Sequence, residues 1–209
     1  MITVARRRRR FMLILLLSAL VCTACLYLIH ACAAPERDLQ FLDSLEVPSW
    51  IDVQLITPGG DARPGRKLSA LHHIVIHYVG NPGTTAQQNR NYFNNPDTKV
   101  SAHFIVGLDG EIIQCVPLAE RAVASNQANA DSFSIEVCHP EEDGRFTEEG
   151  YQSLVRLCAW LCQNCGLDAD ALIRHYDVSG KACPVYYVNN PEEWENLKLD
   201  VAVYLSAME

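Results

Sequence analysis

The sequence predicts an α/β domain in which helices flank a mixed β-sheet. Segments of strand-like composition alternate with segments of helical periodicity, which is typical of helices packed against a sheet. Two of the strand-like segments flank Asp109-Gly110, a dipeptide typical of tight antiparallel hairpins, so the sheet should contain antiparallel as well as parallel neighbours. The length of 209 residues and the hydrophobic content of 49% suit one domain with a proper core.

The first strong strand is expected at residues 73–79. This segment reads HIVIHYV and lies between the turn Arg63-Pro64-Gly65 and the breaker Asn81-Pro82-Gly83. The remaining elements are assigned in the same way from composition and periodicity. Further strands are expected at residues 102–108, 111–117, 132–138 and 171–174, and helices at residues 85–94 and 191–206.

The longest helix is expected to begin after Thr147. Threonine is a favourable N-cap, the two glutamates that follow suit the positive end of the helix dipole, and Gly166 is placed to end the helix. The apolar face of this helix carries three thiols, which we expect to pack as small hydrophobic groups, although a redox-active pair of the last two is an alternative. These thiols are Cys158, Cys162 and Cys165.

The N-terminal residues 1–34 predict a membrane signal. An unbroken arginine run, Arg6–Arg10, precedes 19 uncharged positions, Phe11–Ile29, which as a helix would span roughly 28 Å. Arginines before such a segment hold that end in the cytoplasm, so an uncleaved signal anchor would leave the rest of the chain extracytoplasmic. The alternative is a cleaved signal peptide ending near Ala31-Cys32-Ala33, which would make the domain secreted. We expect a short stalk at residues 35–49 and one folded domain at 50–209.

The charge of the chain is divided unevenly. Residues 35–209 carry 12 of the 17 basic residues and all 25 acidic residues, a net charge of −13. A nucleic-acid partner requires a basic face, so this acidity argues against binding DNA or RNA.

Three side chains suggest a metal site. His175 and Cys183 lie eight positions apart after a predicted strand, and His77 lies near the end of the first strong strand. Imidazole and thiolate are favoured zinc ligands, and three protein ligands with one open position define a catalytic zinc site. The alternative for His77 alone is a hydrogen-bonded core histidine.

Five segments occur in an order that resembles a known family. Together they resemble the zinc-dependent N-acetylmuramoyl-L-alanine amidases, which share a fold with phage lysozyme-type amidases and peptidoglycan recognition proteins. The resemblance covers roughly residues 50–200 and implies a zinc site in a surface cleft at one side of the sheet, with His77, His175 and Cys183 as ligands. The segments are 74–83 (IVIHYVGNPG), 101–104 (SAHF), 134–137 (SIEV), 174–177 (RHYD) and 183–184 (CP).

The resemblance also implies two catalytic residues. Glu136 matches a carboxylate that acts as general base in one branch, and Lys181 matches a lysine that stabilises the oxyanion. Period-two alternation places Ser134, Glu136 and Cys138 on the strand face opposite the apolar residues, where a cleft explains a carboxylate better than a core. The alternatives are a structural ion pair of Glu136 with an arginine, and a solvated loop lysine.

The sequence departs from relatives at two places. Lytic phage-type members carry a tyrosine before the histidine matched by His103, but this chain has Ala102, which shifts the expected base role to Glu136. Many relatives have a Trp-His pair where this chain reads AVASN over residues 122–126, so Ser125 and Asn126 are possible substrate contacts. His103 itself is expected to be structural.

The implied activity is hydrolysis of the amide between N-acetylmuramic acid and L-alanine of the stem peptide, by zinc-activated water. The expected partners are therefore peptidoglycan and, through residues 1–34, a membrane; the sequence leaves the oligomeric state open. One alternative is a non-catalytic peptidoglycan-binding receptor of the same fold. A second is a cysteine peptidase that uses Cys183, which is disfavoured because no obvious helix follows Pro184.

Overall fold

The computed structural model describes residue 18 and residues 38–208. The chain divides into two compact units, Met1–Arg37 and Asp38–Glu209. The expected membrane anchor or signal peptide at residues 1–34 lies outside the described residues, apart from Ser18. Among the helices of the described part, none is long and apolar enough to cross a membrane.

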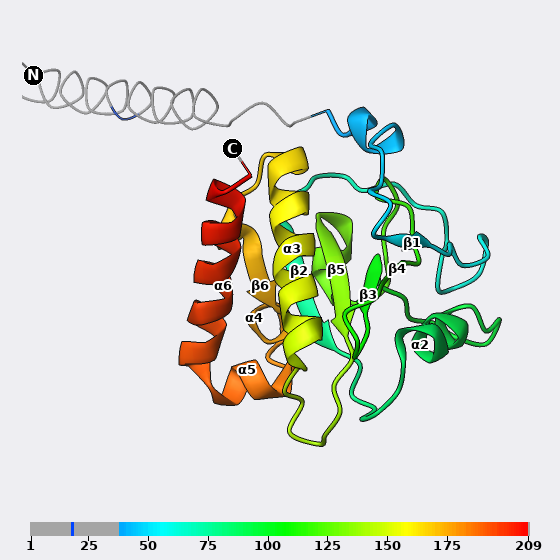
Figure 1. The fold of residues 1–209 in the computed structure, drawn as a ribbon. Coiled ribbons are helices and arrows are strands. Elements are labelled where there is room, and N and C mark those ends of the chain that lie inside the picture. Colours follow the sequence, from blue (N-terminus) through cyan, green and yellow to red (C-terminus); the bar gives the residue numbers. More distant parts are fainter. Residues whose placement is uncertain (1–17, 19–37, 209) are drawn as a thin grey trace, which may run out of the picture. The chain divides into compact units, whose positions relative to one another are not determined.

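Six strands form one mixed sheet in the second unit, as the sequence predicts (Figure 1). Their order across the sheet is β1-β4-β3-β5-β2-β6, and every pair of neighbours is parallel except β3 and β4, which form the predicted hairpin. The strands are β1 (Asp52–Val53), β2 (His73–Tyr78), β3 (Phe104–Val106), β4 (Ile112–Gln114), β5 (Ser132–Val137) and β6 (Leu172–Arg174).

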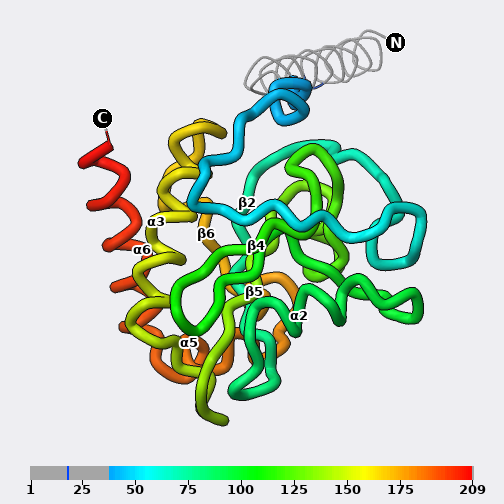
Figure 2. Tube along the Cα trace, turned by 45° about the vertical axis from the view of Figure 1, so that its right-hand side comes forward, coloured from blue at the N-terminus to red at the C-terminus, as the bar shows by residue number. Residues whose placement is uncertain are grey.

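Helices cover the sheet on both faces. In Figures 1 and 2, α3 and α6 lie side by side against the sheet, and α2 lies apart from them. The α-helices are α2 (Ala86–Phe93), α3 (Glu148–Cys165), α4 (His175–Ser179), α5 (Val185–Asn189) and α6 (Pro191–Ser206). Short 3₁₀ turns are η1 (Gln40–Asp43), η2 (Asn126–Ala130) and η3 (Ala169–Ala171).

The two faces of strand β5 divide the interior into two hydrophobic clusters. Phe133, Ile135 and Val137 belong to the larger cluster, which includes the apolar faces of α3 and α6. Cys138 belongs to the smaller cluster, which includes residues of α2. The predicted alternation is confirmed, and Glu136 is therefore directed away from the α3–α6 layer.

Helix α3 begins and ends where the sequence predicts. Thr147 caps its N-terminus, accepting a hydrogen bond from the Gly150 N–H, and Gly166 ends it in the left-handed conformation. Cys158 and Cys162 are buried thiols on its inner face, and Cys165 is buried with them. These cysteines fill the core as expected.

Residues 175–189 contain two short helices that the sequence analysis does not predict. Helices α4 and α5 each span five residues, about one and a half turns, which is too short for amphipathic periodicity to reveal. Tertiary and local contacts hold them: Asp177 accepts hydrogen bonds from the backbone and side chain of Arg174, and the Tyr176 N–H donates to the Cys183 carbonyl.

Residues 38–49 lie within the second compact unit. Leu42 is buried in the larger hydrophobic cluster, with Leu39 and Leu45 packed against it. The three leucines recur every third residue, so the turn around η1 can direct them together onto the core. The boundary expected at residue 50 therefore falls inside the folded unit.

The Thr147 hydroxyl should contribute measurably to folding. It caps α3 and also donates a hydrogen bond to the Leu108 carbonyl beside the hairpin at 2.6 Å. We expect Thr147→Ala to lower the free energy of unfolding by about 1–2 kcal/mol, whereas Thr147→Ser should retain most of it. Urea unfolding of the two variants measures this difference. Equal losses in both would contradict the capping role.

Candidate active site

The parallel strands bring the candidate residues to one edge of the sheet. Strand β2 pairs in parallel with β5 on one side and β6 on the other, so their carboxyl ends lie at the same edge. His77 is directly opposite Glu136 in this register. His175 follows the last residue of β6 and opens α4. Residues about 60 and 100 positions apart in the sequence thereby become neighbours.

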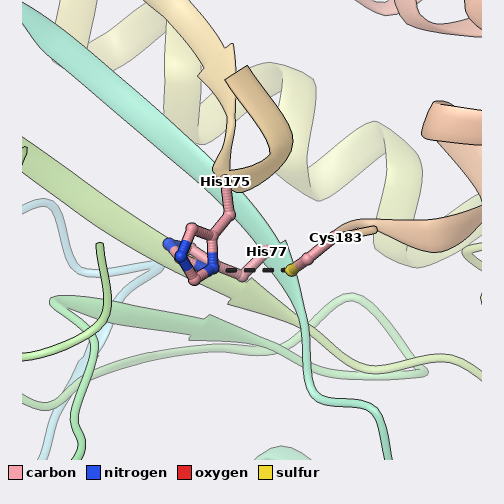
Figure 3. Close-up of side chains that lie close together, drawn as sticks. All are labelled: His77, His175 and Cys183. Atoms are coloured by element: carbon pink, nitrogen blue, oxygen red, sulfur yellow. Dashed lines mark hydrogen bonds between the residues drawn. The ribbon is translucent and has the colours of Figure 1, made fainter. Parts of the chain in front are cut away.

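His77, His175 and Cys183 form a compact cluster at this edge. Their potential ligand atoms all lie within 4.8 Å of one another, and all three residues are buried. Figure 3 shows the His175 ring beside the His77 ring and the Cys183 sulfur approaching from a separate loop. The ring centroids are 4.7 Å apart, and His77 Nδ1 lies 3.8 Å from Cys183 Sγ. Two nitrogens and one sulfur thus face a common point.

Backbone hydrogen bonds hold the Cys183 loop against α4. The Tyr176 N–H donates to the Cys183 carbonyl at 2.9 Å, which places Cys183 beside the first turn of α4. Within the loop, the Cys183 N–H donates to the Lys181 carbonyl at 2.7 Å. The positions of His175 and Cys183 are therefore fixed together.

Burial holds the two imidazoles in their neutral form. Burial is the largest cause, and together with the neighbouring His175 and Lys181 it lowers the pKa of His77 to about 3. Burial likewise lowers the pKa of His175, and Lys181 adds to this effect. Neutral imidazole is the form that binds metals, so the histidines are ready to act as ligands at neutral pH.

The Cys183 thiol lacks the environment of a nucleophile. Burial, followed by the charge of Glu136, raises its pKa to about 12. A nucleophilic cysteine requires a lowered pKa. Helix α5 does begin at Val185, contrary to the expectation that no helix follows Pro184, but this short helix does not offset the effect of burial. The chain without a metal therefore keeps the thiol protonated at neutral pH.

A pair of serine hydroxyls lies behind His77. His77 Nε2 is 3.0 Å from Ser125 Oγ, which is 3.0 Å from Ser134 Oγ, and both serines are buried. Asn129 Oδ1 accepts hydrogen bonds from the backbone N–H groups of Ala124 and Ser125, which fixes the Ser125 backbone. With a proton on Nε2 donated to Ser125, the Nδ1 lone pair of His77 faces Cys183.

The sequence did not reveal this role of Ser125. The sequence gives Ser125 only as a possible substrate contact, whereas its hydroxyl contacts the far nitrogen of His77. The period-two pattern placed Ser134 on the same face as Glu136, but only folding brings Ser125 beside it. No short-range pattern links positions 77, 125 and 134.

His103 is structural, as expected. Its Nδ1 accepts from the Ser134 N–H, and its Nε2 donates to the Glu120 carbonyl at 2.9 Å. Both ring nitrogens are therefore satisfied, and the side chain is fully buried. Burial lowers its pKa to about 4, so it is a neutral bridge between β5 and the loop at Glu120.

Glu136 and Lys181 line the same cavity as the cluster. Glu136 Oε2 is shielded from solvent and has no hydrogen-bond partner among the described residues, where Glu136 also forms no ion pair. The structural ion pair with an arginine is thus absent there. Burial raises the pKa of the Glu136 carboxyl to about 8, and the charge of Lys181 offsets part of this rise.

The cavity extends from the cluster to helix α2. Its volume is about 600 Å³, which is large enough for a substrate segment of several residues. Apart from the five candidate residues, polar and aromatic side chains of α2 and the preceding loop form much of its lining. These are Asn81, Thr84, Gln88, Asn89 and Tyr92.

The sequence is similar to those of known N-acetylmuramoyl-L-alanine amidases. The profile of the N-acetylmuramoyl-L-alanine amidase family matches residues 67–186. The chain is 33% identical over 165 residues to N-acetylmuramoyl-L-alanine amidase BlyA of Bacillus subtilis, a match covering 69% of this chain and 44% of that protein. It is 34% identical over 148 residues to the amidase CwlL of Bacillus licheniformis, covering 63% and 41%. The chain thus spans less than half the length of these curated relatives.

Solved structures agree with the fold. The catalytic domain of XlyA superposes with a TM-score of 0.64 at 29% sequence identity, covering 72% of this chain and 98% of that domain. PlyL gives the same TM-score at 22% identity and supports the fold alone. The mixed sheet and its flanking helices are therefore those of this group of catalytic domains.

The buried Glu136 carboxyl should make the metal-free chain less stable at higher pH. Its pKa rises from the ordinary 4.5 to about 8 on folding, so between these values the folded state holds a proton that the unfolded state releases. Stability should therefore fall with a slope approaching roughly 1.4 kcal/mol per pH unit across this window. Glu136→Gln should remove this contribution and raise the melting temperature at pH 8 but not at pH 4.

Thermal unfolding in the presence of a chelator, at several pH values, measures this effect. The matched control is Glu192→Gln, which removes an exposed carboxylate from α6. The same pH profile in both variants would show that Glu136 does not carry the effect.

Proposed function

The chain belongs to the family of N-acetylmuramoyl-L-alanine amidases, and from this premise we propose that it hydrolyses the amide bond between N-acetylmuramic acid and L-alanine in peptidoglycan. One observation carries the proposal. The cluster of His77, His175 and Cys183 shares a cavity with Glu136, whose Oε2 atom is buried and lacks a hydrogen-bond partner among the described residues. A metal that activates water and a neighbouring carboxylate that accepts its proton are together sufficient for amide hydrolysis.

The cluster fits zinc. Two nitrogen donors and one sulfur donor are a common zinc set, and the fourth position is left for a water molecule or the substrate. Tetrahedral zinc would hold a nitrogen and a sulfur ligand about 3.6 Å apart, and the His77 Nδ1 to Cys183 Sγ distance is 3.8 Å. His175 Nδ1 is buried without a hydrogen-bond partner among the described residues. When bound, zinc would acidify a water molecule and polarise the carbonyl of the scissile amide.

Glu136 is the general base in this proposal. It lines the cavity directly opposite His77 in the sheet register. A zinc ion held by the neighbouring cluster would lower the pKa of the Glu136 carboxyl from its metal-free value of about 8, so that the carboxylate could accept the proton of the attacking water. The same group then returns the proton to the leaving amine of L-alanine, which completes the cleavage. Such general acid–base assistance contributes typically about 10²–10⁴-fold in rate.

Lys181 supplies positive charge at the carbonyl oxygen. It is exposed at the cavity rim, and its charge influences His77, His175, Glu136 and Cys183. Negative charge that develops on the amide oxygen during attack is stabilised by a cation at this position.

Ser125 is a positioning residue. Its hydroxyl can accept a hydrogen bond from His77 Nε2–H, which fixes the imidazole orientation and leaves Nδ1 as the donor atom. Partners of this kind behind a metal-binding histidine typically contribute about 10–100-fold in metal affinity.

The proposal includes export. The arginine run and uncharged segment within residues 1–34 support a signal anchor that would hold the catalytic domain at the outer side of a membrane. The alternative to a membrane-anchored protein is a secreted domain that is released when a signal peptide is cleaved. In both cases the domain would meet peptidoglycan outside the cytoplasm.

Digestion of purified peptidoglycan tests the activity. We expect the full chain to release new L-alanine amino termini without new reducing sugar ends, and a chelator should stop the release until zinc is restored. Glu136→Gln should lower the rate by about 10²-fold or more while retaining zinc, and Glu192→Gln should leave it unchanged.

Other outcomes identify the rival functions. Retained binding of muramoyl peptides without any release would indicate a receptor. Release that resists the chelator but stops on thiol alkylation would make Cys183 a nucleophile. Full activity of Glu136→Gln would refute its role as general base.

Zinc affinity tests the positioning role of Ser125. We expect Ser125→Ala to weaken zinc binding by about 10–100-fold, measured by competition with a chromophoric chelator. Ser125→Thr retains a hydroxyl and should restore part of the affinity, and Ser206→Ala on α6 is the matched control. The ¹⁵N chemical shifts of the His77 ring should indicate a mixture of the two tautomers only in Ser125→Ala. If Ser125→Ala changed neither the zinc affinity nor these shifts, the positioning role of Ser125 would be excluded.

A further inference from the structure

One turn beside the metal cluster contacts both of its histidines. Ser125 precedes the turn η2, and its Oγ lies 3.0 Å from His77 Nε2. The next residue, Asn126, lies with its Nδ2 3.5 Å from His175 Nε2. Two consecutive residues of the chain therefore contact the outer ring nitrogens of two histidines that follow from different strands, β2 and β6.

Asn126 has a backbone conformation that few residue types adopt. Its φ is 52°, and among the described residues it is the only residue other than glycine with a positive φ. Asparagine, aspartate and glycine tolerate this left-handed region better than the other residue types. Such a conformation persists where the surrounding contacts require it.

The turn is tied to the structure on both sides of Asn126. Gln127 Nε2 donates a hydrogen bond to the Val178 carbonyl at 2.7 Å, which ties η2 to the helix α4 that His175 opens. Asn129 Oδ1 accepts hydrogen bonds from the two backbone N–H groups that precede Asn126. These bonds hold the Asn126 amide at the edge of the His175 ring.

The two ring nitrogens of His175 have different surroundings. Nδ1 is buried and has no hydrogen-bond partner among the described residues, so it is the nitrogen available to a metal. A neutral imidazole carries one proton, which lies on Nε2 when Nδ1 is the metal ligand. The Nε2–H group then requires an acceptor, as the outer nitrogen of a metal-binding histidine almost always has one.

The Asn126 side chain can supply this acceptor. A half-turn of the amide about its Cβ–Cγ bond exchanges Oδ1 and Nδ2, and no other side-chain hydrogen bond of Asn126 within the described part of the chain opposes it. With Nδ2 towards His175 Nε2, the imidazole proton would lie on Nδ1, where it has no acceptor among the described residues. With Oδ1 towards Nε2, the proton is accepted and Nδ1 is free for a metal.

We propose that Asn126 is a positioning residue for His175, whose Nε2 proton its side-chain oxygen accepts, so that Nδ1 becomes the metal donor. The inference rests on the zinc site of the proposed function. Because Ser125 acts in the same way on His77, the single turn η2 and the residue before it orient both imidazole ligands. This role takes the place of the substrate contact that the sequence offers for Asn126.

The positive φ decides which variants test this role without straining the backbone. Asn126→Gly removes the amide, Asn126→Asp retains an acceptor oxygen, and both residue types tolerate the left-handed conformation. In the full chain we expect Asn126→Gly to weaken zinc binding about tenfold, the low end of the usual range because Asn126 is exposed. Asn126→Asp should bind zinc at least as tightly as the parent chain. Competition with a chromophoric chelator measures both affinities.

A matched control loosens the turn but leaves the amide in place. Gln127→Ala deletes the hydrogen bond to the Val178 carbonyl and should weaken zinc binding no more than about threefold. A loss in Gln127→Ala as large as that in Asn126→Gly would overturn the proposal, because attachment of the turn would then explain both. A loss in Asn126→Asp as large as that in Asn126→Gly would overturn it as well.

The ring ¹⁵N chemical shifts of the metal-free chain give a second readout, which general destabilisation would not move. In the parent chain and in Asn126→Asp we expect the His175 proton on Nε2, and in Asn126→Gly a mixture of the two tautomers. The His77 shifts should be the same in all three proteins, because Ser125 is unchanged. A His175 proton on Nδ1 in the parent chain, or the same tautomer in the parent and Asn126→Gly, would refute the positioning role.

The rival role of Asn126 and failure of the proposed function give different results. Unchanged zinc affinity in Asn126→Gly together with a raised KM for peptidoglycan would make Asn126 a substrate contact and overturn the proposal. A wild-type chain that releases no L-alanine amino termini, while the variants show the expected zinc affinities and shifts, would refute the amidase and support the role of Asn126. Zinc-dependent release with equal zinc affinity in the parent and Asn126→Gly would support the amidase and refute that role.

Discussion

The parallel register of β2 with β5 and β6 is the constraint on which the rest of the structure depends. Parallel neighbours end at the same edge, so His77, Glu136 and His175 meet there although long segments of chain separate them. A shift of one residue in the pairing of β5 would turn Glu136 into the layer of α3 and α6 and direct Ile135 towards the cavity. The apolar residues of β5 in the larger cluster oppose such a shift.

The polar groups at this edge differ in how well they are satisfied. Ser125, Ser134 and His103 form a connected set of short hydrogen bonds that ties the loop at 120–129 to β5. Glu136 Oε2 and His175 Nδ1 are buried without partners among the described residues. Unsatisfied buried polar atoms are costly, and a ligand in the adjacent cavity would offset that cost. The rigid network therefore supports a site that is itself less stable than a packed core.

Positive charge is local on an acidic chain. The chain from residue 35 onward has a net charge of −13, so it repels anions at long range. Lys181 lines the cavity that holds the cluster of His77, His175 and Cys183, and provides positive charge there. In the function that we propose, this charge would act on the bound substrate more than on the rate of encounter.

The amino-acid pattern alone determined the mixed sheet, the hairpin at Asp109-Gly110 and the limits of α3 and α6, because alternation, helical periodicity and capping are local signals. It also placed Glu136 on the polar face of β5, and the ordered motifs identified His77, His175 and Cys183. The five-residue helices α4 and α5 were not predicted, because helices this short are stable only with tertiary contacts, such as the hydrogen bond from the Tyr176 N–H to the Cys183 carbonyl. The hydrogen bond between Ser125 and His77 was decided only by tertiary structure, because side chains distant in sequence meet only once strands and loops have paired.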